Sequence, residues 1–229
     1  DNLSGLLERV LRETDTPRIR LGSLEPWDLP NAFWRLFEDQ RLMPHLHLPL
    51  QSGADSVLKR MARRCKRDEF ERLVDSARNA LPDFNVTTDI IVGFPGETDD
   101  EWHQTMEFVQ RIGFGHLHIF AYSPRAGTLA AEMPDQVPIE IKRARSQQLH
   151  RLGQQMKQEL LASHLGRTRP VLVEGIRADA CGAYAAGYTP NYLPIRLRTA
   201  DTGLVNQTVQ VRLESLTRDG EAIDASPLQ

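Results

Sequence analysis

Polar side chains recur at alternate positions of segments that otherwise resemble buried strands. In the run HLHLPLQ, His45, His47 and Gln51 alternate with leucines, and in HLHIFAY, His116 and His118 alternate with aliphatic residues. The same alternation places further polar groups opposite apolar ones, namely Arg18, Arg20, Asp89 and Tyr122. Because successive side chains of a strand point to opposite faces, each segment predicts one apolar and one polar face. A shared polar face predicts a chamber for a polar ligand. The alternative is a structural network in which Asp89 neutralises arginine.

A glycine-rich turn joins one of these segments to a helix. Residues 85–93 have the pattern of a buried strand, and Thr98 followed by Glu101 forms a capping box that begins a helix. The intervening Gly93-Phe94-Pro95-Gly96 is then the turn at the carboxyl end of a strand, where α/β folds place ligands. Glycines without Cβ atoms let a ligand approach the backbone closely, although a tight turn alone would also need them.

The elements that position these groups alternate along the chain. We predict strands at 18–24, 45–50, 85–93 and 116–122, and helices at 31–40, 55–64, 68–81 and 98–112. A helix that begins near Leu3, with Ser4 as its cap, precedes them. Strands and helices that alternate at this spacing predict a parallel sheet with right-handed crossovers. The fold class is therefore α/β, with part of a (β/α) TIM-like barrel over residues 1–137.

The second part of the chain has a different texture. A long charged amphipathic helix is predicted over 138–165, and 166–229 holds short strands separated by turn residues, which predicts a small antiparallel β-barrel. Small Greek-key barrels often bind oligonucleotides. Arg196 and Arg198 share a strand face, and Tyr188, Asn191 and Tyr192 lie in the loop before it. Aromatic residues beside arginine suit base stacking on single-stranded RNA, and an ordinary exposed strand face is an equal alternative.

The bulk composition limits the possibilities. The chain has 229 residues, a formal net charge of −3 and two cysteines, Cys65 and Cys181, which form neither a disulfide framework nor a metal motif. No apolar stretch is long enough to span a bilayer, so we expect a cytoplasmic protein without membrane contact. The first residue is Asp1 rather than methionine, so we expect a fragment of a longer protein.

Several segments together resemble a known family. RIRLGSLEP, HLHLPLQSGADSVLKRMARR, TTDIIVGFPGETDDEW and FAYSPRAGTLAAEMPDQVP are similar to consecutive segments of the radical SAM methylthiotransferases. GYTPNYLPIRL resembles their C-terminal TRAM barrel. The resemblance covers almost the whole chain, and within the family it favours the branch that acts on threonylcarbamoyladenosine. Gly22, where serine is usual, and Ala54 are small departures.

The resemblance implies a methylthio group inserted at C2 of that adenine, beside the anticodon of tRNA. It implies S-adenosylmethionine and two [4Fe–4S] clusters in the full-length parent; the cofactors supply the chemistry and the protein orients them. The cluster-binding cysteines are missing from this sequence, so we expect a fragment without clusters that is inactive alone. The electron donor stays unknown.

The resemblance also assigns roles to residues. Ile91, Gly93 and Glu97 would form the loop that holds S-adenosylmethionine, with Glu97 steadying it. Further cofactor contacts are expected at the other strand ends and on the following helix: Ser23, Glu25, Gln51, Ser52, Arg63 and Tyr122. Ser52 could instead cap the helix at Asp55, and Arg63 could be a solvated helix residue. Arg125 would reach the RNA, together with Tyr188, Asn191, Tyr192, Arg196 and Arg198.

Three rival interpretations stay open. One is a non-catalytic RNA-binding protein, and another is a sister methylthiotransferase that acts on isopentenyladenosine or on a ribosomal protein. A Schiff-base aldolase is weaker, because Lys59, Lys66, Lys142 and Lys157 all fall in predicted helices or loops. Finally, a barrel without its first strands would expose an edge at 18–24, through which we expect the fragment to self-associate.

Overall fold

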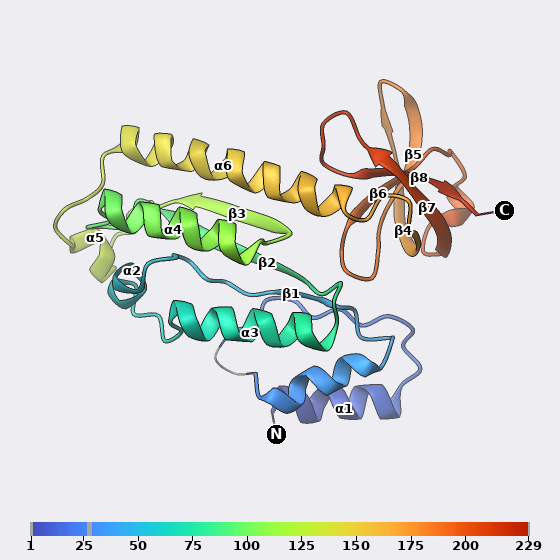
Figure 1. The fold of residues 1–229 in the computed structure, drawn as a ribbon, viewed down its shortest axis with the longest axis horizontal. Coiled ribbons are helices and arrows are strands. Elements are labelled where there is room, and N and C mark those ends of the chain that lie inside the picture. Colours follow the sequence, from blue (N-terminus) through green and yellow to red (C-terminus); the bar gives the residue numbers. More distant parts are fainter. Residues whose placement is uncertain (1, 27–28, 229) are drawn as a thin grey trace. The chain divides into compact units, whose positions relative to one another are not determined.

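A computed structural model describes residues 2–26 and 29–228 and divides the chain into two compact units, Asp1–Met156 and Lys157–Gln229 (Figure 1). The division falls within the long helix α6 (Ile139–Ala162). No helix among the described residues is both long enough and apolar enough to cross a membrane.

The first unit is built on a parallel sheet. Strands β1 (His45–His47), β2 (Asn85–Val92) and β3 (His116–Ala121) lie in that order. Helices α2 (Asp55–Arg60) and α3 (Arg67–Ala80) connect β1 to β2, and α4 (Asp99–Ile112) connects β2 to β3. The predicted α/β class with its parallel sheet is confirmed.

Local sequence signals explain the best-predicted helix. Thr98 Oγ1 accepts a hydrogen bond from Glu101 N at 3.2 Å, while the Glu101 carboxylate accepts from Thr98 N at 2.9 Å, which is the predicted capping box. Gly113 ends α4 with a φ of 66°, a left-handed conformation that glycine adopts without strain. The first helix, α1 (Leu3–Glu13), is capped by Asn2 rather than by Ser4, because the Asn2 side chain accepts from Gly5 N.

Prolines shorten two of the predicted strands. Residues 18–24 form only isolated bridges, at Ile19 and Ser23, beside the segment that leads into β1. Pro44 in that segment has no N–H, and His45 N donates to Met43 O, so the ladder is interrupted between the two bridges.

β1 itself ends at His47, ahead of Pro49. Beyond His47, hydrogen bonds to the Thr88 side chain take the place of regular backbone pairing with β2. The Thr88 hydroxyl accepts from Leu50 N at 2.9 Å and donates to Leu48 O at 2.6 Å. The chain therefore stays beside β2 without regular strand pairing.

Two further elements of this unit differ from expectation. The helix predicted at 31–40 is a 3₁₀ helix, η1 (Asn31–Glu38), and a short helix, α5 (Leu129–Glu132), was not predicted.

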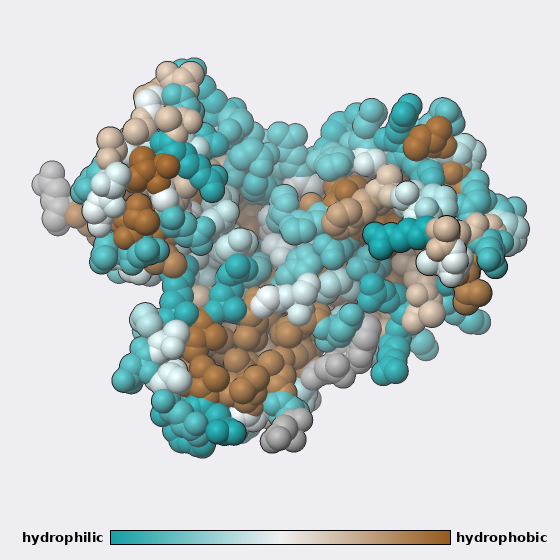
Figure 2. Space-filling view, turned by 180° about the vertical axis from the view of Figure 1, so that it is seen from behind, coloured by the Kyte–Doolittle hydropathy of each residue, from teal (hydrophilic) through white to brown (hydrophobic). Residues whose placement is uncertain are grey.

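The apolar face of the sheet packs on the helices, as predicted. Leu46, Leu48 and Ile90 have no exposed surface and share one core with Phe70 of α3 and Phe108 of α4. In Figure 1, α3 and α4 lie in front of the sheet; Figure 2 shows the molecule from behind, with a hydrophobic area in the lower half of the view. The other face of the sheet carries the polar His47, Asp89 and His118 together with Ile91 and Phe120.

The second unit is a closed barrel. Its strands are β4 (Thr168–Asp179), β5 (Gly182–Tyr188), β6 (Pro194–Leu197), β7 (Thr208–Leu216) and β8 (Ile223–Pro227), in the order β4-β5-β6-β8-β7. A short 3₁₀ helix, η2 (Thr202–Leu204), precedes β7. Val211 and Leu213 point into the buried interior, as their alternation predicts. The small barrel is confirmed, although β6 and β8 pair in parallel and β8 was not predicted.

Candidate functional site

The carboxyl ends of the strands bring three predicted residues to one edge of the sheet. Gln51 bridges to Ile90 beyond the end of β1, and Ile91 N donates to Gln51 O at 2.9 Å. Gly93 follows β2 directly, and Tyr122 N donates to Val92 O at 2.9 Å beyond the end of β3. Gln51 has a φ of 77°, an unusual conformation for a residue with a side chain. Ligands of open parallel sheets bind at such an edge.

The glycine-rich turn after β2 is held by its own glutamate. Gly93 and Gly96 have φ values of 73° and 74°, which explains the need for glycine at both positions. Gly93 N donates to Glu97 Oε1 at 3.1 Å, so Glu97 steadies the loop as expected. Burial raises the pKa of Glu97, although the Arg145 guanidinium and the Gly93 N–H both oppose that rise.

Two buried cations of α6 complete this loop and were missed by the sequence analysis. Arg145 Nη1 contacts Glu97 Oε1 at 2.6 Å, and Lys142 Nζ donates to Tyr122 O at 3.1 Å. The Lys142 stem fills the space beside Gly93, where a Cβ atom would lie 2.2 Å from its Cγ. A signal existed: both cations occupy the same helical stripe as Leu149 and Met156, with successive spacings of three, four and seven residues.

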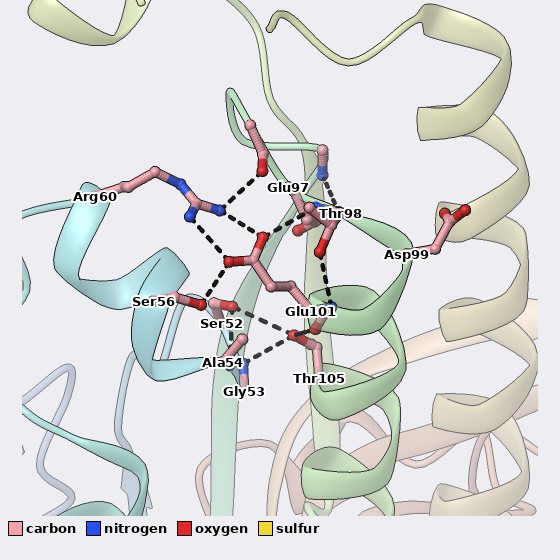
Figure 3. A network of polar contacts seen from close by, with 12 residues as sticks. Ser52, Gly53, Ala54, Ser56, Arg60, Glu97, Thr98, Asp99, Glu101 and Thr105 are labelled. Carbon is pink, nitrogen blue, oxygen red and sulfur yellow. Dashed lines mark hydrogen bonds and ion pairs between the residues drawn. The ribbon is translucent and has the colours of Figure 1, made fainter.

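A second network joins α2 to α4 beneath the loop (Figure 3). Arg60 binds both carboxylate oxygens of Glu101, at 2.9 and 2.6 Å, and also donates to Gly96 O at 3.1 Å. Burial alone would raise the pKa of Glu101, but hydrogen bonds from Arg60, Ser56 and the Thr98 N–H lower it to about 2. This network therefore keeps a buried carboxylate ionised and ties the loop to two helices.

Ser52 belongs to this packing rather than to the open edge. Its side chain is fully buried, its Oγ accepts from Ala54 N at 3.2 Å, and it lies 3.3 Å from Thr105 Oγ1 (Figure 3). The cap position of α2 is Ala54, so Ser52 is not the helix cap either. Ser52 shapes the turn after β1.

Glu25 was expected to face the amino group of S-adenosylmethionine, and Arg63 its carboxylate. In the structure these two side chains contact each other. Arg63 Nη1 lies 3.4 Å from Glu25 Oε2, and the two side chains are partly exposed. Ser23, also exposed, bridges to His47 of β1. An ion pair of this length with access to solvent is weak. Its two side chains can therefore separate and bind a ligand that carries both an ammonium and a carboxylate group.

Tyr122 and Arg125 follow β3. The Tyr122 ring packs edge-on against Phe94, with centroids 5.3 Å apart, and its hydroxyl oxygen is buried without a hydrogen-bond partner among the described residues. A buried hydroxyl without a partner is costly and marks a place where a ligand atom fits. Arg125 is exposed.

The predicted polar face of the sheet is present, but on it Asp89 pairs with histidine and not with arginine. Asp89 Oδ1 lies 3.2 Å from His47 Nε2 and 3.5 Å from His118 Nδ1. Asp89 therefore pairs with histidines of both neighbouring strands, whereas the alternative interpretation paired it with arginine. His45 is buried, and desolvation, then the nearby Arg20 and His47, lower its pKa to about 3.

The two cysteines do not suit an iron–sulfur cluster. Cys65 is buried, and desolvation followed by the nearby Glu69 and Asp55 raises its pKa to about 11, away from the thiolate that a cluster needs. Cys181 lies in the other compact unit. Across residues 2–26 and 29–228, no three His, Cys, Asp or Glu side chains are grouped to hold a metal ion.

One face of the barrel gathers arginine and tyrosine. The Arg196 and Arg198 guanidinium carbons lie 5.2 and 5.5 Å from the centre of the Tyr184 ring. Both arginines are already paired with acids: Arg198 contacts Asp179 at 2.9 Å, and Arg196 contacts Asp219 at 2.7 Å. The predicted shared face is present, but its positive charge is largely neutralised within the barrel.

The end of β5 and the loop before β6 present a stacked tyrosine pair, so Tyr188 lies on the strand and not in the loop as expected. Tyr188 and Tyr192 lie face to face, with ring centroids 4.3 Å apart. Asn191 is buried, and its side chain bonds Thr189 Oγ1 at 2.7 Å and lies 3.4 Å from His164 Nε2. Asn191 thus orders the loop that carries Tyr192.

Comparisons with known proteins agree with this architecture. Residues 9–109 match the family model of the Radical SAM superfamily. The chain is homologous to tRNA methylthiotransferases. It is 36% identical over 223 residues to the tRNA-2-methylthio-N(6)-dimethylallyladenosine synthase of Bacillus pumilus, which covers 96% of this chain and 44% of the relative. It is 41% identical over 174 residues to the threonylcarbamoyladenosine tRNA methylthiotransferase of Thermotoga maritima, which covers 76% of this chain and 40% of the relative.

The chain spans less than half the length of these curated relatives. Among solved structures, it resembles coproporphyrinogen III oxidase from Escherichia coli, a radical SAM enzyme, with a TM-score of 0.55 and 13% identity over 97% of this chain and 55% of that one. At this identity the likeness supports the fold alone.

Proposed function

We propose that the whole protein is a cytoplasmic radical SAM tRNA methylthiotransferase. In it, residues 1–137 are the C-terminal part of the barrel, 138–165 a linking helix and 166–229 a TRAM-type RNA-binding barrel. The observation that carries the proposal is the edge of the sheet, where Gln51, Gly93 and Tyr122 meet beside a loop that Glu97 holds open. Homology over 96% of the chain supports the same assignment.

S-adenosylmethionine fits this edge because the edge offers groups for each of its polar parts. Glu25 and Arg63 form an exposed pair whose charges match the ammonium and carboxylate of the cofactor. The backbone of Ile91 and Gly93 and the side chain of Gln51 would contact the adenosine. The buried Tyr122 hydroxyl supplies a further hydrogen-bonding atom. When bound, the cofactor supplies the radical chemistry and the methyl group.

Other residues act on the site indirectly. Glu97 and Ser52 position the loop and the turn around the cofactor, because their polar atoms are occupied by neighbouring residues. Ser23 lies exposed at the end of its segment, near enough in sequence to Glu25 to share its role. The described residues offer no cluster site, so the two [4Fe–4S] clusters implied by the family would need ligands from another part of the protein.

The proposed reaction places a methylthio group at C2 of N6-threonylcarbamoyladenosine beside the anticodon. The segments RIRLGSLEP and HLHLPLQSG favour this substrate, and so does the Thermotoga relative. The dimethylallyladenosine synthases among the relatives favour the other tRNA substrate, isopentenyladenosine. A ribosomal protein is the third alternative.

For RNA binding we propose Arg125 and the tyrosine and arginine face of the barrel. Tyr188 and Tyr192 offer an aromatic platform, and nearby in sequence Arg196 lies on β6 and Arg198 directly follows it. Asn191 orders this loop. The partner would be the anticodon stem-loop of tRNA.

Mass spectrometry of tRNA nucleosides from a deletion strain tests the proposal. We expect loss of the methylthio group from threonylcarbamoyladenosine and its return when the full-length gene is restored. Loss from isopentenyladenosine would select the sister activity. Unchanged tRNA, together with no binding of S-adenosylmethionine by the full-length protein in calorimetry, would leave the non-catalytic RNA-binding alternative.

A further inference from the structure

A connected set of polar side chains runs across the three strands of the sheet. Thr87 Oγ1 lies 3.0 Å from His47 Nδ1, and His47 Nε2 lies 3.2 Å from Asp89 Oδ1. His118 Nδ1 lies 3.5 Å from the same Asp89 oxygen. The set therefore links β1, β2 and β3, and it ends at His118, whose side chain is 50% exposed.

The hydrogen-bond directions in this set fix which nitrogen of His118 accepts. Asp89 can only accept, so His47 Nε2, 3.2 Å away, carries a proton and donates to it; in neutral His47 the Nδ1 atom then accepts from the Thr87 hydroxyl. Asp89 is an acceptor only, so it also takes the Nδ1 proton of His118. In neutral His118 the Nε2 atom then carries a lone pair, and within the described ranges no residue forms a hydrogen bond to it.

An exposed aromatic ring lies beside this acceptor. Phe120 is two residues beyond His118 on β3 and therefore on the same face, roughly 7 Å along the strand. It is 52% exposed, an unusual state for a large apolar side chain within a sheet. Ile91, its register partner on β2, adds an apolar surface next to it.

We propose that His118 and Phe120 form a subsite for the purine base of the RNA nucleoside that is modified. A purine supplies a π surface for Phe120 and N–H donors for His118 Nε2, and the two groups are spaced to engage one base. Both residues precede Tyr122, and Phe120 lies in register with Ile91, whose backbone is assigned to the cofactor. The inference rests on the proposed function and adds the residues that would read the base. Asp89 and His47 are positioning residues.

A thermodynamic cycle tests this with the full-length protein and two anticodon stem-loops, one with adenosine and one with an abasic residue at the modified position. Fluorescence anisotropy should show that wild type loses about 5- to 100-fold in affinity without the base. Phe120→Ala should remove most of that difference, and His118→Ala should reduce it by about 3- to 10-fold. His103→Ala, an exposed histidine of α4, is the matched control and should keep it.

Two further measurements keep the outcome unambiguous. Nitrogen-15 NMR should find the Nδ1–H tautomer at His118, and Asp89→Asn should shift it to the Nε2–H form. Calorimetry with S-adenosylmethionine should give the same affinity for wild type, Phe120→Ala and His118→Ala. A full base contribution in both variants would overturn the subsite, and so would a loss confined to cofactor binding. Failure of wild type to bind either ligand would overturn the proposed function itself.

Discussion

Arg145 of α6 and Glu97 of the loop after β2 form a buried ion pair, with Nη1 and Oε1 2.6 Å apart and side chains only 6% and 1% exposed. Arg145 also donates to the Glu97 carbonyl at 3.1 Å. A helix some fifty residues later in the chain thus fixes the loop that we assign to the cofactor.

Breaking this pair should destabilise the first unit. Arg145→Met leaves the Glu97 carboxylate buried without its cation, which typically costs about 3–5 kcal/mol. The second substitution in Arg145→Met/Glu97→Gln removes that charge and should restore part of the loss. Urea denaturation at pH 7 measures both. Equal stability of the single and double variants would contradict a penalty that arises from the unpaired charge.

The same pair predicts a pH dependence. Burial raises the folded-state pKa of Glu97 above its usual value of 4.5. A carboxylate with a raised pKa stabilises the fold most below 4.5 and loses this contribution as the pH rises through the folded-state pKa. Because Arg145 opposes the rise, Arg145→Met should increase the loss of stability between pH 4.5 and 7. Denaturation midpoints across that window, with Glu97→Gln as the control that lacks the dependence, would show it.

Gly93→Ala should disturb both the loop and the contact with α6. The φ of 73° strains any residue with a Cβ, and the new Cβ would lie 2.2 Å from Lys142 Cγ. We expect a loss of about 2–4 kcal/mol and weaker S-adenosylmethionine binding by the full-length protein. Gly113→Ala, with a φ of 66° and open space around its Cβ, isolates the strain and should cost about 1 kcal/mol without affecting binding. Equal effects would refute a role for the Lys142 contact.

These contacts show where the sequence was sufficient and where it was not. Strands β2 and β3, helix α4 and the capping box at Thr98 follow from periodicity and local hydrogen bonds, which act over a few residues. The partner of Glu97 is Arg145, and those of Asp89 are His47 and His118; all three pairs depend on packing between distant segments. Such pairs leave no local pattern. In the sequence, Lys142 and Arg145 stand out only as cations on an otherwise apolar stripe of the helix. An amphipathic pattern of this kind usually indicates a surface helix, so it does not point to buried ion pairs.

Glu101 should govern the acid stability of the first unit. Burial would raise its pKa, but hydrogen bonds from Arg60, Ser56 and Thr98 lower it from 4.5 to about 2. A lowered pKa contributes stability above 4.5 that is lost as the pH falls toward 2, at most about 3 kcal/mol here. Glu101→Gln should therefore flatten the fall in stability between pH 4.5 and 2. Thermal unfolding across this range, with the exposed Glu107→Gln as control, would detect it; parallel curves would exclude the effect.

On the barrel, the acids beside the arginines should limit RNA affinity. Asp179 contacts both Arg198 and Arg196, at 2.9 and 3.6 Å, so Asp179→Asn should free positive charge and strengthen stem-loop binding. Arg198→Ala should weaken binding and reduce the salt slope by about one. Asp201→Asn, which keeps the cap of η2, is the neutral control. Anisotropy titrations across a salt series measure all three, and unchanged slopes would remove this face from the RNA interface.

The segment at 18–24 should make this chain self-associate. One edge of the segment bonds toward residues 41–47, and among the described residues no strand pairs with its other edge. Leu6 of the preceding helix α1 is 59% exposed and adds an apolar surface. Unpaired strand edges pair with other copies, and proline blocks such pairing.

Gly22→Pro should therefore shift a concentration-dependent oligomer toward monomer in light scattering. Gly22→Ala, whose Cβ meets open space, should not. A strictly monomeric wild-type chain at all concentrations would show that the edge is covered in solution.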